Sequence, residues 1–246
     1  MTTTLPLPKV DDRSPLPLYY QVREAVRQAI RERYQPGDLI PSESELQESF
    51  GVSRATIRQA LQELVAEGLL QRRRGRGTFV AAPKIAEALP RIVSFSEEMR
   101  KQGLVPSTRS VRVEAVPAPT RVVESLGLAA DERCLRLERI RCANDRPIVL
   151  LVSYLPERLG IDPREDFTGS LYALLEGKYG IQLGEARQVI EAAAADKPVA
   201  RALEIDEGDP ILIIRRGVFS RARAPVEYVE GFYRADRYRY EIRLER

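Results

Sequence analysis

The sequence predicts an α+β protein of two domains, in which a small helical domain precedes a larger domain built on an antiparallel sheet. Two observations carry this prediction. Near the N-terminus, apolar residues recur at steps of three and four and are followed by two short β-prone runs. Farther along, strand-like runs joined by short turns dominate. With 246 residues available, we place the first domain at 14–82, a linker at 83–91 and the second domain at 92–246.

The composition is that of an ordinary globular protein and excludes several classes of protein. Hydrophobic residues make up 43% of the chain and charged residues 30%, and the net charge is only +3. No run of about 18 apolar residues is present, so we expect no membrane span. The first residues lack a basic start followed by an apolar run, so we expect no secretory signal and a cytoplasmic protein.

The chain contains no histidine and only two cysteines, Cys134 and Cys142. The absence of histidine removes Ser-His and Cys-His catalysis and the commonest metal ligand. Two cysteines are too few for a disulfide framework or a zinc site, so we expect two inert thiols. Carboxylate or lysine chemistry is not forbidden by these counts. We expect no catalytic residues, no metal and no cofactor.

Three helices are predicted in the first domain. The first covers about 18–33, because Val22, Val26 and Ile30 recur at helical steps and form one apolar stripe. The second begins at 42–45, where the order Ser-Glu-Ser-Glu is that of a capping box. In such a box the serine accepts a hydrogen bond from a free backbone amide while the second glutamate reaches back to the start of the helix.

The third helix begins after Ser53, places Ile57 on its inner side and ends near Glu67. Two β-prone runs, 69–73 and 78–80, then flank a glycine-containing turn and predict a hairpin. Helix, helix, tight turn, helix and hairpin is the order of a winged helix-turn-helix.

The third helix and the hairpin carry side chains that suit DNA. Arg54 and Arg58 are four residues apart and share one helix face, opposite Ile57. A recognition helix enters the major groove with its N-terminal residues leading, and arginine pairs with guanine there. In the hairpin, glycines let the backbone approach a duplex, and the arginines of 72–76 neutralise phosphates or enter the minor groove. A solvated arginine face is the alternative, and the order of the elements favours DNA binding.

The second domain alternates strands with short helices. Strands are predicted at about 109–116, 134–143, 148–154, 188–193, 211–219 and 226–233, and helices near 94–102, 120–126, 170–179 and 198–203. The stretches 126–154 and 203–233 resemble each other, since each has an acidic turn, a strand bearing arginine, a turn ending in proline and a strand ending near tyrosine. This similarity predicts two related hairpins in one sheet, with a chance likeness between strand pairs as the alternative.

A candidate anion site lies on one of these strands. Arg139 and Arg141 have period-two spacing, so both project from one face, and two guanidinium groups on one face suit a phosphate or a carboxylate. Ser170 stands near the start of a predicted helix, where anions bind. The residues that we add as hydrogen-bonding groups for a ligand are Tyr172, Glu227 and Tyr233. The alternative is a surface strand face whose arginines pair with Glu138 or Asp145.

The segments 41–46, 51–61, 67–69 and 75–80 resemble the GntR family of bacterial regulators. The resemblance covers about 18–82 and implies a homodimer that binds a short inverted repeat in double-stranded DNA. The residues that we assign to DNA binding, from their positions and from this resemblance, are Ser42, Glu43, Ser44, Ser53, Arg54, Thr56, Arg58, Arg74, Arg76 and Gly77.

The second domain resembles the HutC-type sensor, called the UTRA domain, whose fold is like that of chorismate lyase. The segments that carry the resemblance are 94–99, 103–106, 139–141, 145, 147, 154–156, 170–172, 227–228 and 233–238. It implies an effector cleft and a dimer interface rather than catalysis. Relatives that sense amino sugars tend to have a carboxylate four residues after the equivalent of Pro147, whereas this chain has Leu151, which argues against a hexosamine phosphate.

Three hypotheses for the function follow. The leading one is a sequence-specific DNA-binding transcription regulator, expected to be a repressor that a small anionic metabolite, such as a phosphorylated sugar or a carboxylic acid, releases from DNA. The second is an enzyme of chorismate-lyase-like type, in which Arg139, Arg141 and Glu227 hold a carboxylated substrate; it rests on fold analogy alone. The third is an architectural DNA binder whose second domain dimerises without sensing a ligand.

Overall fold

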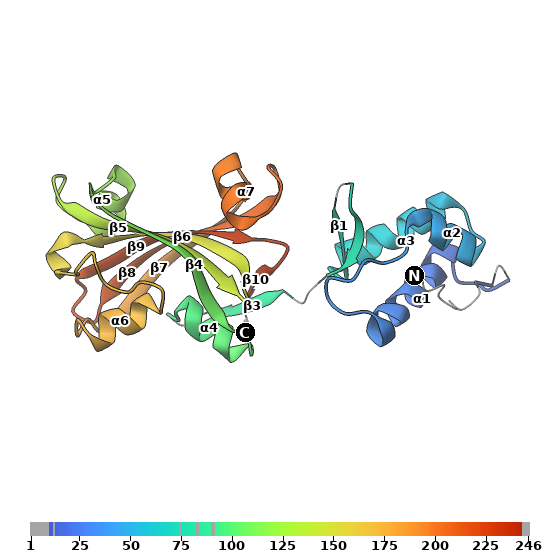
Figure 1. Cartoon of the computed structure of the whole chain (residues 1–246), viewed down its shortest axis with the longest axis horizontal. Helices are drawn as coiled ribbons and strands as arrows, with labels where there is room; N and C mark the ends of the chain where they lie inside the picture. Colours follow the sequence, from blue (N-terminus) through green and yellow to red (C-terminus); the bar gives the residue numbers. More distant parts are fainter. Residues whose placement is uncertain (1–9, 12, 74, 82–83, 90–91, 243–246) are drawn as a thin grey trace. The chain divides into compact units, whose positions relative to one another are not determined.

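The computed structural model describes residues 10–11, 13–73, 75–81, 84–89 and 92–242. The chain divides into two compact units, 1–83 and 84–246 (Figure 1). Each unit encloses its own clusters of buried apolar side chains. Within the described ranges, no helix is long and apolar enough to cross a membrane.

The N-terminal unit consists of the predicted three helices and hairpin. Its elements are α1 (Leu18–Arg33), α2 (Glu43–Phe50), α3 (Arg54–Ala66), β1 (Leu70–Arg73) and β2 (Gly77–Val80). The two strands pair antiparallel, with Leu70 opposite Val80. One cluster of buried side chains draws on all five elements and includes Val22, Leu46 and Leu61. The order and the packing confirm the winged helix-turn-helix.

Side-chain caps fix where α2 and α3 begin. The Ser42 hydroxyl accepts a hydrogen bond from the Glu45 amide at 3.3 Å, and the Glu45 carboxylate accepts one from the Ser42 amide at 2.7 Å, as the predicted capping box requires. The Ser53 hydroxyl accepts a hydrogen bond from the Thr56 amide at 3.2 Å. Such caps satisfy amides that the helix itself leaves without partners. The start of α3, and with it the position of its first arginine, is therefore set by Ser53.

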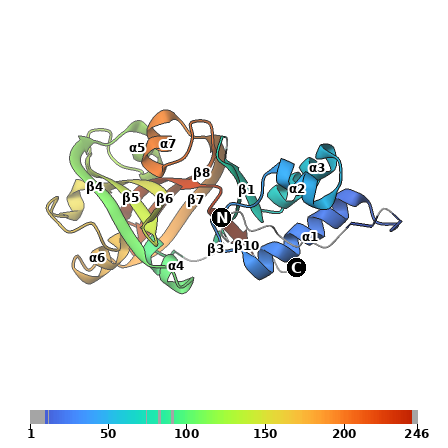
Figure 2. The ribbon, with the colours of Figure 1, turned by 45° about the vertical axis from the view of Figure 1, so that its right-hand side comes forward.

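The C-terminal unit is built on a six-stranded antiparallel sheet (Figure 2). The strand order in this unit is β4-β5-β6-β9-β8-β7. Its elements are β3 (Ile85–Leu89), α4 (Phe95–Lys101), β4 (Pro106–Pro117), α5 (Thr120–Leu126), β5 (Arg133–Ala143), β6 (Arg146–Pro156), the 3-10 helix η1 (Glu157–Leu159), α6 (Leu171–Gly177), β7 (Leu183–Ala194), α7 (Lys197–Leu203), β8 (Pro210–Ser220), β9 (Pro225–Arg234) and β10 (Tyr238–Ile242). The α+β class with an antiparallel sheet is as predicted.

The sheet consists of two halves with the same order of elements. One half is β4-α5-β5-β6 and the other is β7-α7-β8-β9, and they meet where β6 pairs with β9. The two stretches whose similarity the sequence displays form the hairpins β5–β6 and β8–β9. The repeat therefore corresponds to two equivalent parts of one sheet.

The helices cover the two faces of the sheet in pairs. Helices α5 and α7 lie over one face, and α4 and α6 lie over the other (Figure 1). Met99 of α4 packs in the cluster that contains Leu151 of β6, and Leu171 of α6 packs in the cluster that contains Leu137 of β5. Because side chains alternate along a strand, Arg139 and Arg141 face α4 and α6 together with Leu137.

The range 83–91, which we predicted as a linker, contains a strand that the sequence did not reveal. Strand β3 pairs in parallel with β10, so that Ile85 lies opposite Tyr238. Pairing between such distant short segments leaves no local pattern to detect. The C-terminal unit thus begins with a strand fixed to its last described strand.

Candidate functional sites

Helix α3 exposes its arginines and buries its aliphatic side chains. Ile57, Leu61 and Leu64 are at most 1% exposed, whereas the Arg54 side chain is 70% exposed and Arg58 is also exposed. Two guanidinium groups one helical turn apart are therefore available to a partner outside the bundle. This is the arrangement that a recognition helix requires.

Glu43, in the first turn of α2, lies between the recognition helix and the hairpin. Its carboxylate accepts hydrogen bonds from Nε of Arg54 at 3.5 Å and from an Nη of Arg72 at 3.0 Å. The Glu43 side chain is 22% exposed, less than either arginine. The structure therefore places a carboxylate between two of the basic groups of this surface.

The second strand of the hairpin, or wing, begins at Gly77, whose backbone conformation disfavours any other residue. Gly77 has φ +107°, and a Cβ atom there would lie 2.7 Å from a methyl group of Leu39. Arg76 beside it is exposed, as is Ser44 on α2. Arg74, which we also assigned to DNA binding, lies outside the described residues.

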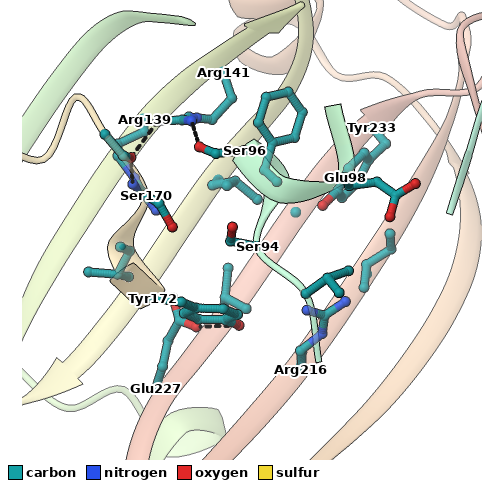
Figure 3. A pocket seen from close by; sticks show the side chains of 18 of the residues that line it. Ser94, Ser96, Glu98, Arg139, Arg141, Ser170, Tyr172, Arg216, Glu227 and Tyr233 are labelled. Carbon is teal, nitrogen blue, oxygen red and sulfur yellow. Dashed lines mark hydrogen bonds between the residues drawn. The ribbon is translucent and has the colours of Figure 1, made fainter. Parts of the chain in front are cut away.

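All six residues that we assigned to the effector site line one cavity of about 60 Å³ in the C-terminal unit (Figure 3). Arg139 and Arg141 come from β5, Ser170 and Tyr172 from the start of α6, and Glu227 and Tyr233 from β9. Segments far apart in the sequence thus converge between the sheet and the helices α4 and α6.

Arg141 is 2% exposed, and its hydrogen-bond acceptors among the described residues are all neutral. Its guanidinium donates hydrogen bonds to the hydroxyls of Thr108 and Ser96, both at 2.6 Å. It also donates to the backbone carbonyls of Thr168 and Gly169, both at 2.8 Å. These bonds fix the orientation of the guanidinium and leave its positive charge uncompensated.

Arg139 is 4% exposed and is held more loosely. Its only hydrogen bonds within the described residues are two of 3.4 Å, to the carbonyls of Phe167 and Gly169. In the same part of the chain, Nε of Arg139 and Nε of Arg141 have no hydrogen-bond partner. Glu138, the alternative partner that we considered, pairs with Arg136 at 2.5 Å on the other face of the strand.

Burial lowers the pKa of both arginines. The pKa of Arg141 falls to about 10, first because of burial and then because of the neighbouring charge of Arg139. The pKa of Arg139 is also lowered by burial, which the charge of Glu227 partly offsets. Two adjacent buried cations without an ion-paired carboxylate among the described side chains form a site that a bound anion stabilises.

The far side of the cavity is a polar group of three residues. The Tyr172 hydroxyl donates a hydrogen bond to the Glu227 carboxylate at 3.1 Å. Arg216 interacts with Tyr172 and donates a hydrogen bond to Gln188 at 2.6 Å. Burial, followed by the charge of Glu227, raises the pKa of Tyr172, so the phenol keeps its proton.

Several residues that line the cavity were not among the effector-site residues that we predicted from the sequence. Ser94, Phe95 and Ser96 come from the start of α4, and Arg216 comes from β8. The internal repeat was the one available indication for Arg216, because it aligns this residue with Arg139. No sequence pattern connects the start of α4 with a strand that follows some forty residues later.

Both cysteines are buried, and burial raises the pKa of both thiols. Cys134 and Cys142 are at most 1% exposed. Burial raises the pKa of Cys142 and raises that of Cys134 to about 11. Across the part of the chain that the structure describes, no group of histidine, cysteine and acidic residues has the arrangement of a metal site.

Comparison with known proteins assigns both units. The family described as "Bacterial regulatory proteins, gntR family" matches residues 18–80, and the UTRA domain matches residues 101–239. The chain is 36% identical over 239 residues to the HTH-type transcriptional repressor NagR of Bacillus subtilis. This match covers 96% of this chain and 98% of that protein. The chain belongs to the GntR family. Its UTRA domain places it in the HutC-type subfamily.

Two further relatives extend this assignment. The histidine utilization repressor of Pseudomonas putida is 33% identical over 235 residues, 94% of each chain. The crystal structure of PhnF from Mycobacterium smegmatis superposes with a TM-score of 0.65 at 30% identity and covers 91% of this chain and 99% of that one. This GntR-family protein is therefore a DNA-binding transcription regulator with an effector domain. The chorismate-lyase-like enzyme that we considered finds no support, since these relatives are named as regulators.

Proposed function

We propose that this GntR-family regulator is a repressor that binds an inverted-repeat operator as a homodimer and leaves it when a small anion fills the UTRA cavity. It acts in the cytoplasm, where chromosomal DNA is accessible to it. The observation that carries the proposal is the buried pair Arg139 and Arg141, which lacks an ion-paired carboxylate among the described side chains.

The exposed face of α3 supports the DNA-binding half of this proposal. Arg54 and Arg58 are assigned to base edges or neighbouring phosphates, with Thr56 beside them. Ser42, Ser44 and Ser53 stand near helix starts, where hydroxyls and amides meet phosphates. In the wing, we assign Arg74, Arg76 and Gly77 to contacts with the DNA phosphate backbone or the minor groove. The relatives NagR and the histidine utilization repressor, which are named as repressors, support the sign of regulation.

The environment of the buried arginines supports the effector half. A guanidinium in water keeps its hydration, whereas Arg139 and Arg141 are buried, and the acceptors that the described part of the chain offers them are neutral. A phosphate or carboxylate restores opposite charge and occupies the donors that remain. Ser170, at the start of α6 beside Gly169, lies in the same cavity and adds a hydroxyl.

A connection between the cavity and β3, the first strand of the C-terminal unit, supports a regulatory role. Tyr238 lines the cavity and stacks with Tyr233 at 4.3 Å between ring centroids. It also lies opposite Ile85 in β3, the strand that directly follows the N-terminal unit in sequence. An anion that binds one arrangement of these residues better than another shifts the population toward that arrangement. In a dimer this shift alters the spacing of the two recognition helices and weakens operator binding.

The experiment is operator selection followed by fluorescence anisotropy. The full-length protein is used to select duplexes from a random pool, and the expected product is an inverted repeat. Phosphorylated sugars and carboxylic acids are then added to the complex at constant ionic strength. Release by at least one anion supports the proposal. A selected site without two-fold symmetry, or tight binding that no anion alters, contradicts it and favours an architectural binder.

A further inference from the structure

The floor of the cavity beside the arginine pair is apolar. The register of the sheet places Arg139 opposite Leu151, Leu151 opposite Gly231, and Gly231 opposite Ile214. All four residues line the cavity. Val229, one row farther along the sheet, lines it too. A ligand anchored on Arg139 therefore rests its body on aliphatic side chains and a glycine.

The floor is closely packed around Gly231. A Cβ atom at Gly231 would lie 3.1 Å from a methyl group of Leu151 and 2.5 Å from the ring of Tyr233. Leu151 is 9% exposed and Ile214 is 3% exposed, so the floor has little room to rearrange. Leu151 thus occupies the centre of the floor, directly beside the anion site.

The wall formed by the start of α4 places one aromatic ring beside Arg141. Phe95, from the start of α4, lines the cavity, and its ring centroid lies 5.2 Å from the guanidinium carbon of Arg141. Beside it, the Ser94 hydroxyl already accepts the capping hydrogen bond of α4 from the Glu97 amide at 3.2 Å. Because a hydroxyl that accepts one hydrogen bond can still donate another, Ser94 remains a polar group on the α4 wall, and the buried carboxylate of Glu98 is a second one. The apolar part of the lining is therefore the floor, which contains Leu151, Ile214 and Val229.

We propose that the effector joins its anionic group to an apolar body, and that Leu151 determines this preference. The inference rests on the proposed function of the same cavity and adds the class of ligand. A body with hydroxyl groups loses hydrogen bonds to water over Leu151 and Ile214 and gains none from them. An apolar body loses nothing there and gains contact with Phe95 and the aliphatic floor.

The test compares two phosphate monoesters that differ in their bodies, phenyl phosphate and glucose 6-phosphate. Their dissociation constants for the full-length protein are measured by calorimetry, with inorganic phosphate as the reference for the anion site alone. We expect phenyl phosphate to bind at least about tenfold more tightly than glucose 6-phosphate. Leu151→Gln, which adds an amide of similar size, should reduce this ratio severalfold. Leu151→Met, the matched apolar control, should preserve it.

The outcomes separate this inference from the proposed function. If inorganic phosphate binds but glucose 6-phosphate binds as tightly as phenyl phosphate, the anion site stands and the apolar preference is wrong. If the preference exists but Leu151→Gln leaves it unchanged, Leu151 does not determine it and the inference is overturned. If neither inorganic phosphate nor either ester binds, the anion site itself fails, and this inference fails with it.

Discussion

The two units of this regulator use arginine in opposite environments. In the N-terminal unit, Arg54 is 70% exposed and Arg58 is exposed on the same helix face. In the C-terminal unit, Arg139 and Arg141 are at most 4% exposed. The exposed pair stays hydrated in the folded protein, so folding does not have to remove water from these two guanidinium groups. The buried pair has given up hydration in the folded protein, and an anion can recover part of that loss.

This difference in exposure indicates that the two units select their ligands in different ways. Under the proposed function, the exposed arginines attract any polyanion, and the start of α3, which Ser53 fixes, positions them for sequence preference. Under the same proposal, the buried arginines accept only an anion that fits the cavity, and their neighbours determine which anion binds.

The largest effect is expected for Arg141→Gln. This change removes one of the two buried charges, so inorganic phosphate should no longer stabilise the protein. In the wild type, a phosphate concentration of about 100 times Kd should add about 2.7 kcal/mol to the free energy of unfolding. Arg136→Gln, on the opposite face of the same strand and paired with Glu114 and Glu138, is the control and should retain the stabilisation. Thermal unfolding with and without phosphate measures both, and an equal response of the two variants would break the contrast.

Arg58→Ala should weaken binding to the selected operator by about 10- to 100-fold, since a well-placed arginine contributes about 1–3 kcal/mol of base discrimination. The melting temperature should not change, because the side chain is exposed and the buried Ile57 beside it is untouched. Arg164→Ala removes an arginine that is 88% exposed in the other unit and should leave operator affinity unchanged. Anisotropy titrations at several salt concentrations measure both variants. An Arg58→Ala protein with unaltered salt slope and sequence preference would refute the assignment of the recognition helix.

Arg139→Met should raise the stability of the ligand-free protein while removing its response to phosphate. The two hydrogen bonds of Arg139 are long, at 3.4 Å. Removing charge from water costs so much that replacing even a buried ion pair by apolar side chains is often stabilising by about 1–4 kcal/mol. We expect a gain near the lower end of that range, which corresponds to a rise of about 2–4 °C in Tm. Differential scanning calorimetry without added anions measures the change. A fall in Tm would mean that Arg139 is better compensated than its contacts indicate.

The smallest effect is expected for Glu43→Gln. Removing this carboxylate releases Arg54 and Arg72 and takes one negative charge from the DNA-facing surface. Affinity for random duplex DNA should rise a few-fold, and preference for the selected operator should fall by a similar factor. Fluorescence anisotropy with the two duplexes in competition measures the ratio of operator affinity to random-duplex affinity. An unchanged ratio would show that Glu43 does not position the arginines beside it.

The sequence predicts the N-terminal unit more completely than the C-terminal one, for a physical reason. Helix starts at Ser42 and Ser53 and the apolar stripe of α1 are local patterns, and the structure contains each of them. The prediction that Arg139 and Arg141 project from one face of a strand also rests on a local pattern, and the structure confirms it. Their burial was not predictable, because it depends on α4 and α6, whose positions over the sheet are fixed by distant contacts.

The residues that sequence reasoning missed have the same origin. Ser96 and Phe95 enter the cavity because α4 packs on the sheet through Met99. The pairing of β3 with β10 joins opposite ends of the C-terminal unit. Neither contact leaves a trace within a short window of sequence. Arg216 is the exception, since the internal repeat already aligned it with Arg139, which now proves to be a buried cavity residue.

The most direct test of the account is the release of the selected operator by an anion in the wild type and in Arg141→Gln. Phenyl phosphate is titrated into each protein–operator complex at constant ionic strength, with Arg136→Gln as the matched control. The account predicts that both variants bind the operator as the wild type does, and that phenyl phosphate releases the wild type and Arg136→Gln but not Arg141→Gln. Release of all three proteins at the same concentration would contradict it, because the anion would then act without the buried arginine pair.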